Sequence, residues 1–389
     1  MSDDLIYLDY AATTPVDPRV AEIMLAQMTM DGGFANPSSI HIVGRRASEV
    51  VERATRQLAT LINCSAKELI WTSGASESNN LAIIGAARNR EHRGKHLISM
   101  PTEHKAVTDV LRALEKKGFE ITWLQPDADG RLRIGDLADA LRADTQLVSI
   151  MYVNNETGVI QDIKAIGALC RERDVLFHVD AAQGVGKLPF DLATLPVDMA
   201  SMTAHKIYGP KGIGALYKAD RPGCNVDPLL FGGGQQGRIR PGTLPVPLIA
   251  AFGLAARIAG ENLQADFAHV QALNKRLWAG LSTIAGVLRN GSAEHSFPGI
   301  LNVSIEDIEG ESLLLALEPL CVSTGSACNS LKQEPSYVLR SLGRSDELAQ
   351  SAIRFSFGRA TTSAEIDFVI HRYRDAVGKL RQLAPGKAA

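Results

Sequence analysis

The sequence MASMTAHKIYGPKGIGALY, residues 199–217, decides the fold class. Its apolar ends predict two strands, Met199–Met202 and Ile213–Tyr217, joined by a polar segment that contains Lys206 and by a glycine-rich turn. This turn lies between strands and lacks the glycine spacing of a dinucleotide-binding loop. Ligands of α/β proteins bind beyond the carboxyl ends of strands, so Lys206 is the first candidate site residue.

Short apolar runs alternate with amphipathic stretches on the N-terminal side of this sequence. The runs predict strands over Leu69–Thr72, His96–Met100, Gln146–Val153 and Val175–Val179. The amphipathic stretches predict helices, among them Ser76–Arg90, His104–Lys117 and Ile163–Arg173. This alternation predicts an α/β fold with a mostly parallel sheet covered on both faces.

The pattern changes from about Val246 onward. A long helical stretch is followed by strands and a final helix: Leu248–Leu281, Ile300–Ile305, Ala352–Phe357 and Ala364–Leu383. Because a single core stops growing near ~250–300 residues, a chain of 389 residues predicts two domains. We expect a large domain over 16–250 and a smaller α+β domain formed by 1–15 and 251–389.

Composition excludes several function classes. The net charge of −2 gives no basic field to attract nucleic acid or an anionic membrane. The start, MSDDLIYLDY, is not a signal peptide, and the apolar run near Pro247–Ala256 is shorter than the ~20 residues of a membrane span. We therefore expect a cytoplasmic protein that binds neither membrane nor nucleic acid directly. The five cysteines form no CxxC pair and the histidines no metal cluster, so we expect no metal.

Five predicted strands are followed by polar or ionisable groups. The segments that follow them contain Ser76, His104, Asn155, Asp180 with Gln183, and Thr203 with His205 and Lys206. Because the carboxyl ends of parallel strands meet at one edge, these groups predict a single ligand site.

Each group has a chemical and a structural interpretation. A desolvated Lys206 suits Schiff-base chemistry, whereas a surface lysine would have no such role. Asp180 is able to pair with a pyridinium nitrogen or to cap a helix. Gly74-Ala75-Ser76 opens a helix, so it predicts a phosphate cradle or a simple cap. His104 is able to stack on a ring, move protons or cap a helix.

Two further residues come from the C-terminal part. Cys328 lies in STGSACNS, residues 323–330, a small polar segment typical of an exposed loop, so its thiol is a candidate nucleophile. Arg354 lies within a strand pattern and needs an anionic partner, either a substrate carboxylate or a structural carboxylate.

Taken together, the motifs resemble the NifS/IscS-type cysteine desulfurases of the class-V aminotransferase family. The resemblance runs from about Ile6 to Leu383 and rests on YLDYAATTPVDPRV, TSGASESNN, TEHKAV, VNNETGVIQDI, HVDAAQGVGKLP, AHKIYGPKGIG, RPGTLPV, STGSAC and EPSYVLRSLG. It implies an aspartate-aminotransferase-like (fold type I) architecture with a seven-stranded sheet, the cofactor pyridoxal 5′-phosphate (PLP) and a homodimer. The implied reaction converts L-cysteine to L-alanine and leaves the sulfur on an enzyme cysteine as a persulfide.

The resemblance also implies residue roles. Lys206 would hold PLP, Asp180 its ring nitrogen and Gln183 its ring hydroxyl, with His104 stacked on the ring. The phosphate would be bound by Ala75, Ser76, Thr203, His205 and, from the other subunit, Thr243. Asn155, beside the cofactor, and Arg354 would hold the substrate carboxylate, and Cys328 would carry the persulfide.

The sequence departs from this family in three places. Ser76 stands where threonine is frequent and Thr203 where serine is frequent, and both exchanges keep the hydroxyl. Residues 232–243, GGGQQGRIRPGT, lack the usual acidic–basic pair. The sequence ends in LAPGKAA, without the longer tail by which IscS-like members bind the iron–sulfur scaffold.

These departures leave the sulfur-acceptor protein open between iron–sulfur cluster assembly, tRNA thiolation and other pathways. Alternative interpretations are a selenocysteine lyase, another fold type I enzyme such as an aminotransferase, or an inactive scaffold homologue.

Overall fold

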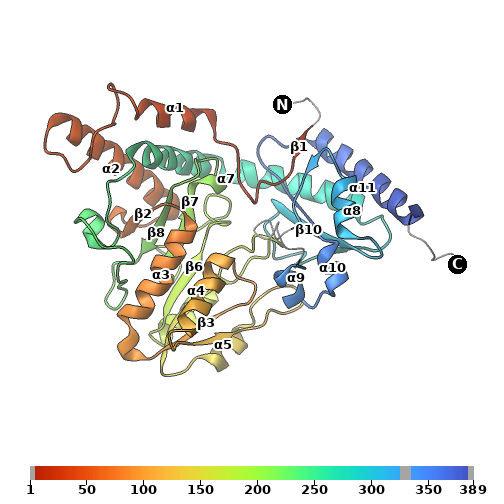
Figure 1. Ribbon diagram of the computed structural model, residues 1–389, viewed down its shortest axis with the longest axis horizontal. Coiled ribbons are helices and arrows are strands. Elements are labelled where there is room, and N and C mark those ends of the chain that lie inside the picture. Colours follow the sequence, from red (N-terminus) through yellow and green to blue (C-terminus); the bar gives the residue numbers. More distant parts are fainter. Residues whose placement is uncertain (1–4, 325–333, 384–389) are drawn as a thin grey trace.

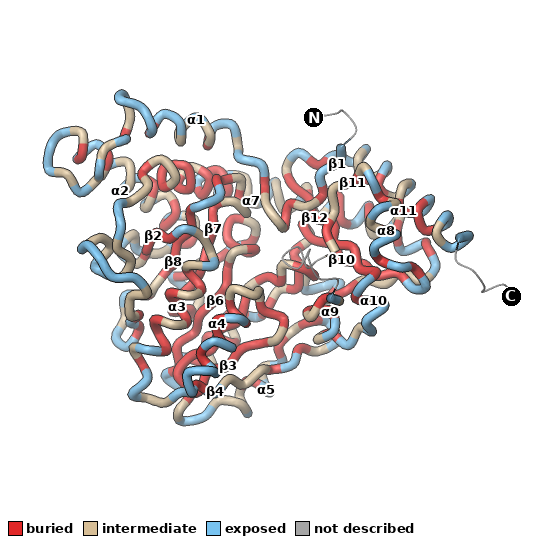
Figure 2. The backbone as a smooth tube through the Cα atoms, in the orientation of Figure 1, coloured by how far each residue is buried: buried red, intermediate tan, exposed pale blue. Residues whose placement is uncertain are grey.

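The computed structural model describes residues 5–324 and 334–383. Its elements form two packed regions that lie side by side, the larger built on a seven-stranded sheet and the smaller on the C-terminal elements (Figure 1). Each region has its own cluster of buried apolar side chains. Figure 2 shows buried residues in the interior of both regions. The division into domains at residue 250 stays a prediction.

The seven-stranded sheet has the order β2-β8-β7-β6-β5-β3-β4. Its strands are β2 (Leu69–Thr72), β3 (His96–Ser99), β4 (Glu120–Trp123), β5 (Thr145–Ser149), β6 (Leu176–Asp180), β7 (Met199–Thr203) and β8 (Gly214–Lys218). Six of the seven strands point in the same direction and β8 alone points in the opposite one, so the predicted mostly parallel seven-stranded sheet is confirmed.

Two details of the sheet differ from the sequence prediction. Strand β4 was not predicted, because Glu120–Trp123 is an edge strand whose residues are only partly buried and carries no continuous apolar run. The run Gln146–Val153 forms a strand only as far as Ser149. The segment that follows β5 instead turns back on itself, and Gly158 N donates to Asn154 O.

Six helices in the described part of the chain belong to the large region, and two of them begin at the predicted polar segments that follow β2 and β3. The six are α1 (Pro18–Ala26), α2 (Ile42–Ile62), α3 (Ala75–Asn89), α4 (Lys105–Glu115), α5 (Ile134–Ala140) and α6 (Ile163–Glu172). Helix α4 is capped by His104, whose Nδ1 accepts a hydrogen bond from Ala106 N at 3.1 Å. The polar segments after β2 and β3 therefore lead directly into helix N-termini.

Helix α7 (Val246–Leu281) joins the two regions. Its first half buries Ile249 and Phe252 in the core of the large sheet, and its second half buries Leu273 and Leu277 in the second core. Within the described residues it is also the one helix whose length and composition would let it cross a membrane, and more than half of its most apolar segment is buried. In this structure α7 therefore packs as a core helix.

The second region contains a three-stranded antiparallel sheet of β9 (Val287–Arg289), β10 (Ile300–Ile305) and β12 (Ile353–Ser356). Helices α8 (Gly310–Ala316), α9 (Tyr337–Ser341), α10 (Asp346–Gln350) and α11 (Ser363–Leu383) complete it. Strand β1 (Ile6–Tyr7) pairs in parallel with β11 (Leu320–Cys321). The first described residues therefore lie against the C-terminal part of the chain.

Candidate active site

A cavity of about 500 Å³ opens at the carboxyl edge of the large sheet and reaches the second region. We call it the main pocket. Most residues chosen from the sequence line it: Ala75, Ser76, His104, Asn155, Asp180, Gln183, Thr203, His205, Lys206 and Arg354. Thr243 is not among the described residues that line the main pocket in its own chain, and Cys328 lies outside the described residues.

Lys206 ends a single helical turn, Ala204–Lys206, that follows β7 directly. Its amine donates to the carbonyl oxygens of Ala11 and Ala12 at 2.6 and 2.7 Å. The N-terminal segment is fixed beside it, since Thr14 N donates to His205 O. The two carbonyl groups that hold the amine were missed by the sequence prediction, because backbone atoms carry no residue-type signal.

Asp180 is the last residue of β6 and is buried. Its Oδ2 accepts from Asn79 Nδ2 at 2.8 Å and its Oδ1 from Ala182 N at 3.0 Å. Asn79 was also missed. The sequence could have indicated Asn79, because it lies three residues after Ser76 on α3 and residues at this spacing share a helix face.

The N-terminus of α3 forms one wall of the main pocket. No described side chain caps its first turn at Gly74, so its first NH groups remain available to an anion. Strand β8 begins very close by, and a Cβ at Gly214 would lie 2.6 Å from the Gly74 backbone. Ser76, Thr203 and His205 line the same wall.

Helix α3 also bears an ion pair with the loop that carries Thr243. Glu77 accepts a hydrogen bond from Ser73 N at 2.6 Å and from Arg240 Nε at 2.8 Å. The altered sequence of residues 232–243 therefore keeps this loop attached to the wall of the main pocket.

The segment after β3 places an acid and a base beside the pocket. Burial lowers the pKa of His104, which favours its neutral ring. Burial raises the pKa of Glu103 well above its usual range, and its carboxyl group accepts from Met151 N at 2.7 Å. Glu103 was missed, because neither periodicity nor spacing distinguishes it from an exposed glutamate.

Arg354 reaches the main pocket from the middle of β12. Its Nη2 forms an ion pair with Asp9 Oδ1 at 2.6 Å, and its Nη1 donates to Asn155 O at 2.8 Å. The structural carboxylate considered from the sequence is thus present. Nevertheless Arg354 Nε and Asn155 Oδ1 are buried and have no partner among the described residues. A bound carboxylate would supply an acceptor for the guanidinium.

Three of the described cysteines, Cys64, Cys170 and Cys224, differ from a reactive thiol. Burial raises the pKa of Cys64 and Cys170 to about 12 and that of Cys224 to about 11. A raised pKa leaves little thiolate, so these three thiols are poor nucleophiles.

The residues of the main pocket fit PLP. The uncapped helix N-terminus with its hydroxyl groups suits the phosphate, the Asp180 carboxylate suits a pyridine nitrogen, and the Lys206 amine suits the aldehyde. Asn155 and Arg354 line the same pocket, so an amide and a guanidinium are available to a further ligand group.

Comparisons with known proteins agree with this geometry. The model of the family described as aminotransferase class-V matches residues 6–369. Cysteine desulfurase IscS of Escherichia coli O139:H28 (strain E24377A / ETEC) is 54% identical over 381 residues, 98% of this chain and 94% of that protein. IscS of Serratia proteamaculans (strain 568) shows the same identity and coverage.

Solved structures are similar as well. A NifS-like protein has a TM-score of 0.90 at 35% identity and covers 97% of this chain and 100% of its own. A structure described as SspA in complex with cysteine has a TM-score of 0.82 at 36% identity and covers 92% of this chain and 100% of its own.

Fold and pocket define the class first: the chain has the aspartate-aminotransferase-like architecture of fold type I PLP proteins. Within that class the chain belongs to the class-V aminotransferase family, among the NifS/IscS-type cysteine desulfurases, which depend on PLP.

Proposed function

We propose that the protein converts L-cysteine to L-alanine and transfers the sulfur to Cys328 as a persulfide. One observation carries the proposal: Lys206, Asp180 and Arg354 all face the main pocket. An amine for the cofactor, a carboxylate for its ring nitrogen and a guanidinium for an amino-acid carboxylate are available together. The similar structure described as a complex with cysteine supports cysteine as that amino acid.

The residues of the main pocket divide the binding task. Ala75, Ser76, Thr203 and His205 bind the phosphate at the N-terminus of α3. Gln183 donates to the ring hydroxyl, and neutral His104 stacks on the ring. Asn155 and Arg354 hold the substrate carboxylate through a charge-assisted contact.

Two residues promote removal of the proton from the substrate Cα, one at the cofactor ring and one at the carbon itself. When bound, PLP supplies an electron sink for the negative charge that develops at the substrate Cα. Asp180, oriented by Asn79, keeps the ring nitrogen protonated. The Lys206 amine takes the proton from the substrate Cα as general base.

The substrate sulfur is transferred to Cys328 by nucleophilic attack. The Cys328 thiolate attacks the substrate sulfur, so an S–S bond forms while the substrate C–S bond breaks. The electron pair of that bond passes to the carbon fragment, which gains a proton and leaves as alanine. One cysteine and one enzyme thiol give one alanine and one persulfide.

Two variants test this division of labour. Lys206→Ala removes the anchor, and we expect the purified protein to lose the visible absorbance of bound cofactor. Cys328→Ala is expected to keep that absorbance and to lose alanine production from cysteine. Full alanine production by Cys328→Ala would contradict the desulfurase proposal.

We further propose that the protein is a homodimer in which Thr243 of the partner subunit completes the phosphate site. Large apolar side chains are exposed between α1 and α2 and in the 230–231 loop, with Ile40 90% and Phe231 87% exposed. Such surfaces mark interaction sites. Thr243 is itself exposed.

Subunit mixing tests this arrangement. Lys206→Ala and Thr243→Ala proteins are unfolded together, refolded and assayed. If Thr243 acts across the interface, the mixed dimer contains one complete site and regains activity. If it acts within its own chain, every site stays defective and the mixture remains as inactive as its parents.

The sulfur leaves Cys328 for an acceptor protein of iron–sulfur cluster assembly or of tRNA thiolation, and we propose the cytoplasm as the place of this transfer. The likeness to proteins named IscS supports the first acceptor. Incubation of the enzyme with radiolabelled cysteine and each candidate acceptor tests the choice. The true acceptor gains label only when Cys328 is intact.

A further inference from the structure

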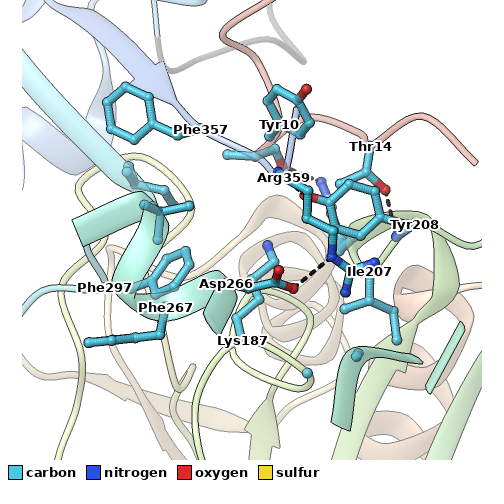
Figure 3. A pocket seen from close by; sticks show the side chains of 17 residues that line it. Tyr10, Thr14, Lys187, Ile207, Tyr208, Asp266, Phe267, Phe297, Phe357 and Arg359 are labelled. Atoms are coloured by element: carbon cyan, nitrogen blue, oxygen red, sulfur yellow. Dashed lines mark hydrogen bonds and ion pairs between the residues drawn. The ribbon is translucent and has the colours of Figure 1, made fainter. Parts of the chain in front are cut away.

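A second lysine, Lys187, lines a smaller cavity, which we call the rear cavity (Figure 3). This rear cavity has a volume of about 40 Å³ and is lined largely by apolar side chains, among them Phe297 and Phe357. It shares Lys206 and Ala11 with the main pocket.

The turn after β6 fixes Lys187 in this position. Lys187 N donates to Gly184 O at 3.1 Å. Gly186 has a φ of +73°, and a Cβ there would lie 2.9 Å from Cγ2 of Ile207, the residue next to Lys206. Since a side chain at residue 186 would force these segments apart, the glycine allows the two lysine-bearing segments to approach.

A continuous chain of hydrogen bonds connects the two lysines. Lys187 Nζ donates to Gln183 Oε1 at 2.7 Å, and Gln183 Nε2 donates to Ala11 O at 2.7 Å. The same Ala11 oxygen accepts from Lys206 Nζ at 2.6 Å. An ammonium group donates and never accepts. Lys187 therefore holds the oxygen of the Gln183 amide and leaves its nitrogen for Ala11 and the main pocket, which Gln183 lines.

We propose that Lys187 is a positioning residue of the cofactor site: it fixes the Gln183 amide as a donor toward the pocket and places a second, partly buried amine close to Lys206. The inference rests on the proposed roles of Gln183 and Lys206. Without Lys187 the orientation of the amide depends on its hydrogen bond to Ala11 O alone. An amide turned by half a rotation presents its oxygen, which repels the electron-rich ring oxygen that it should bind.

The charge of Lys187 gives the proposal a spectroscopic signature. Burial, together with the positive charges of Lys206 and Arg354, lowers the pKa of Lys187 to about 7. The Phe297 ring lies 5.8 Å from Nζ. Other charged or titratable groups around the rear cavity and this amine are His205, Tyr10, Tyr208 and the ion pair of Asp266 with Arg359. A positive charge close to Lys206 makes protonation at Lys206 less favourable.

Three substitutions separate the hydrogen bond from the charge. Lys187→Met removes both, Lys187→Arg retains both, and Lys187→Gln retains a donor without the charge. PLP affinity is measured on cofactor-free protein by fluorescence quenching, and the visible absorbance of the reloaded protein is titrated with pH.

We expect Lys187→Met to weaken PLP binding roughly tenfold, as for loss of one charge-assisted hydrogen bond. We also expect Lys187→Met to raise the pH at the midpoint of the absorbance titration, because it removes a positive charge close to Lys206. Lys187→Arg should resemble the wild type in both measurements, and Lys187→Gln should shift only the midpoint. Equal impairment by Met and Arg would show a packing role and overturn the proposal. If Lys187→Met fails to fold, the comparison of Gln with Arg still decides the point.

A double-mutant cycle tests whether Lys187 acts through Gln183. In a Gln183→Ala background, Lys187→Met should have no further effect on PLP affinity, because the partner it orients is absent. Additive effects would overturn the positioning role. A wild-type protein that binds no PLP would instead refute the proposed function, so the two failures are distinguishable.

Discussion

Two sets of buried polar groups in this protein differ in how completely they are paired. The first, which we call the buried row, crosses the middle of the large sheet and consists of Ser99, Ser149, His178 and Ser201. Ser149 Oγ and Ser201 Oγ contact the two His178 ring nitrogens at 2.8 and 3.0 Å, and Ser99 Oγ donates to Ser149 O at 2.8 Å.

The second set is the rim of the main pocket, and it is incompletely paired. Arg354 Nε and Asn155 Oδ1 have no partner among the described residues, and no described side chain caps α3. Buried polar groups without partners are rare because each costs free energy. Buried atoms with no partner in the described part of the chain also occur away from the main pocket, for example Gln146 Oε1 and Tyr373 OH. The comparison therefore teaches that incomplete pairing points to a ligand only where it coincides with the lining of a pocket and with an uncapped helix N-terminus.

The largest expected effect comes from the rim. Arg354→Lys keeps a positive charge but loses the planar fork, so we expect kcat/KM for cysteine to fall roughly 100-fold or more, with the main loss in KM. Steady-state alanine production measures it. Asp9→Asn is the matched control, since it removes the ion pair but leaves the guanidinium in place. If Asp9→Asn is as defective as Arg354→Lys, Arg354 acts through the ion pair and not on substrate.

The buried row should control acid stability. Burial lowers the pKa of His178 to about 4, so the unfolded chain binds this proton at higher pH than the folded protein does. Stability is therefore lost as pH falls from about 6.5 to about 4, by at most about 3 kcal/mol from this residue.

His178→Gln tests this through urea unfolding of the cofactor-free protein at several pH values. The variant is less stable at neutral pH but loses less stability in the acid range. His104 and His205 titrate in both proteins, so the difference isolates His178. Parallel pH profiles of the two proteins would contradict the prediction.

Asn79 is a buried residue that donates a hydrogen bond to Asp180 of the main pocket. Asn79→Ala should weaken PLP binding roughly tenfold, because the carboxylate loses one buried hydrogen bond and its orientation. Fluorescence titration of the cofactor-free protein measures this. Asn80→Ala is the matched control, because the Asn80 amide contacts Ser76 O and not Asp180, and it should bind PLP more tightly than Asn79→Ala does.

The smallest effect is expected at the half-buried ion pair of Glu77 and Arg240. Arg240→Gln should weaken PLP binding two- to fivefold, since such a pair contributes about 1 kcal/mol or less and anchors the loop that carries Thr243. The effect should shrink in 1 M salt. An unchanged affinity at low salt would show that the loop holds its position by other contacts, such as Gln236 with the backbone of Trp71.

Much of the large region followed from local patterns. Fully buried strands such as β6 and β7 consist mainly of apolar residues, and ionisable or hydroxyl groups stand at their carboxyl ends, so both the sheet and its functional edge were predictable. The edge strand β4 was not, because a partly exposed strand lacks this pattern. Asn79 and Glu103 were not predicted either, because their hydrogen-bond partners lie far away in the sequence. Lys187 was not predicted because only the fold brings it, with its near neighbour Gln183, beside Lys206.

The sequence alone determined the class of fold, the motifs of the family and the residue types that PLP chemistry needs, since these depend on periodicity and on short local segments. Only the tertiary structure decided which buried polar groups are paired and which are not. Pairing joins Lys187 to Gln183 and Asp9 to Arg354, residues 4 and 345 positions apart in the chain. Hydrogen bonding depends on distance in space and on desolvation, and separation along the sequence specifies neither.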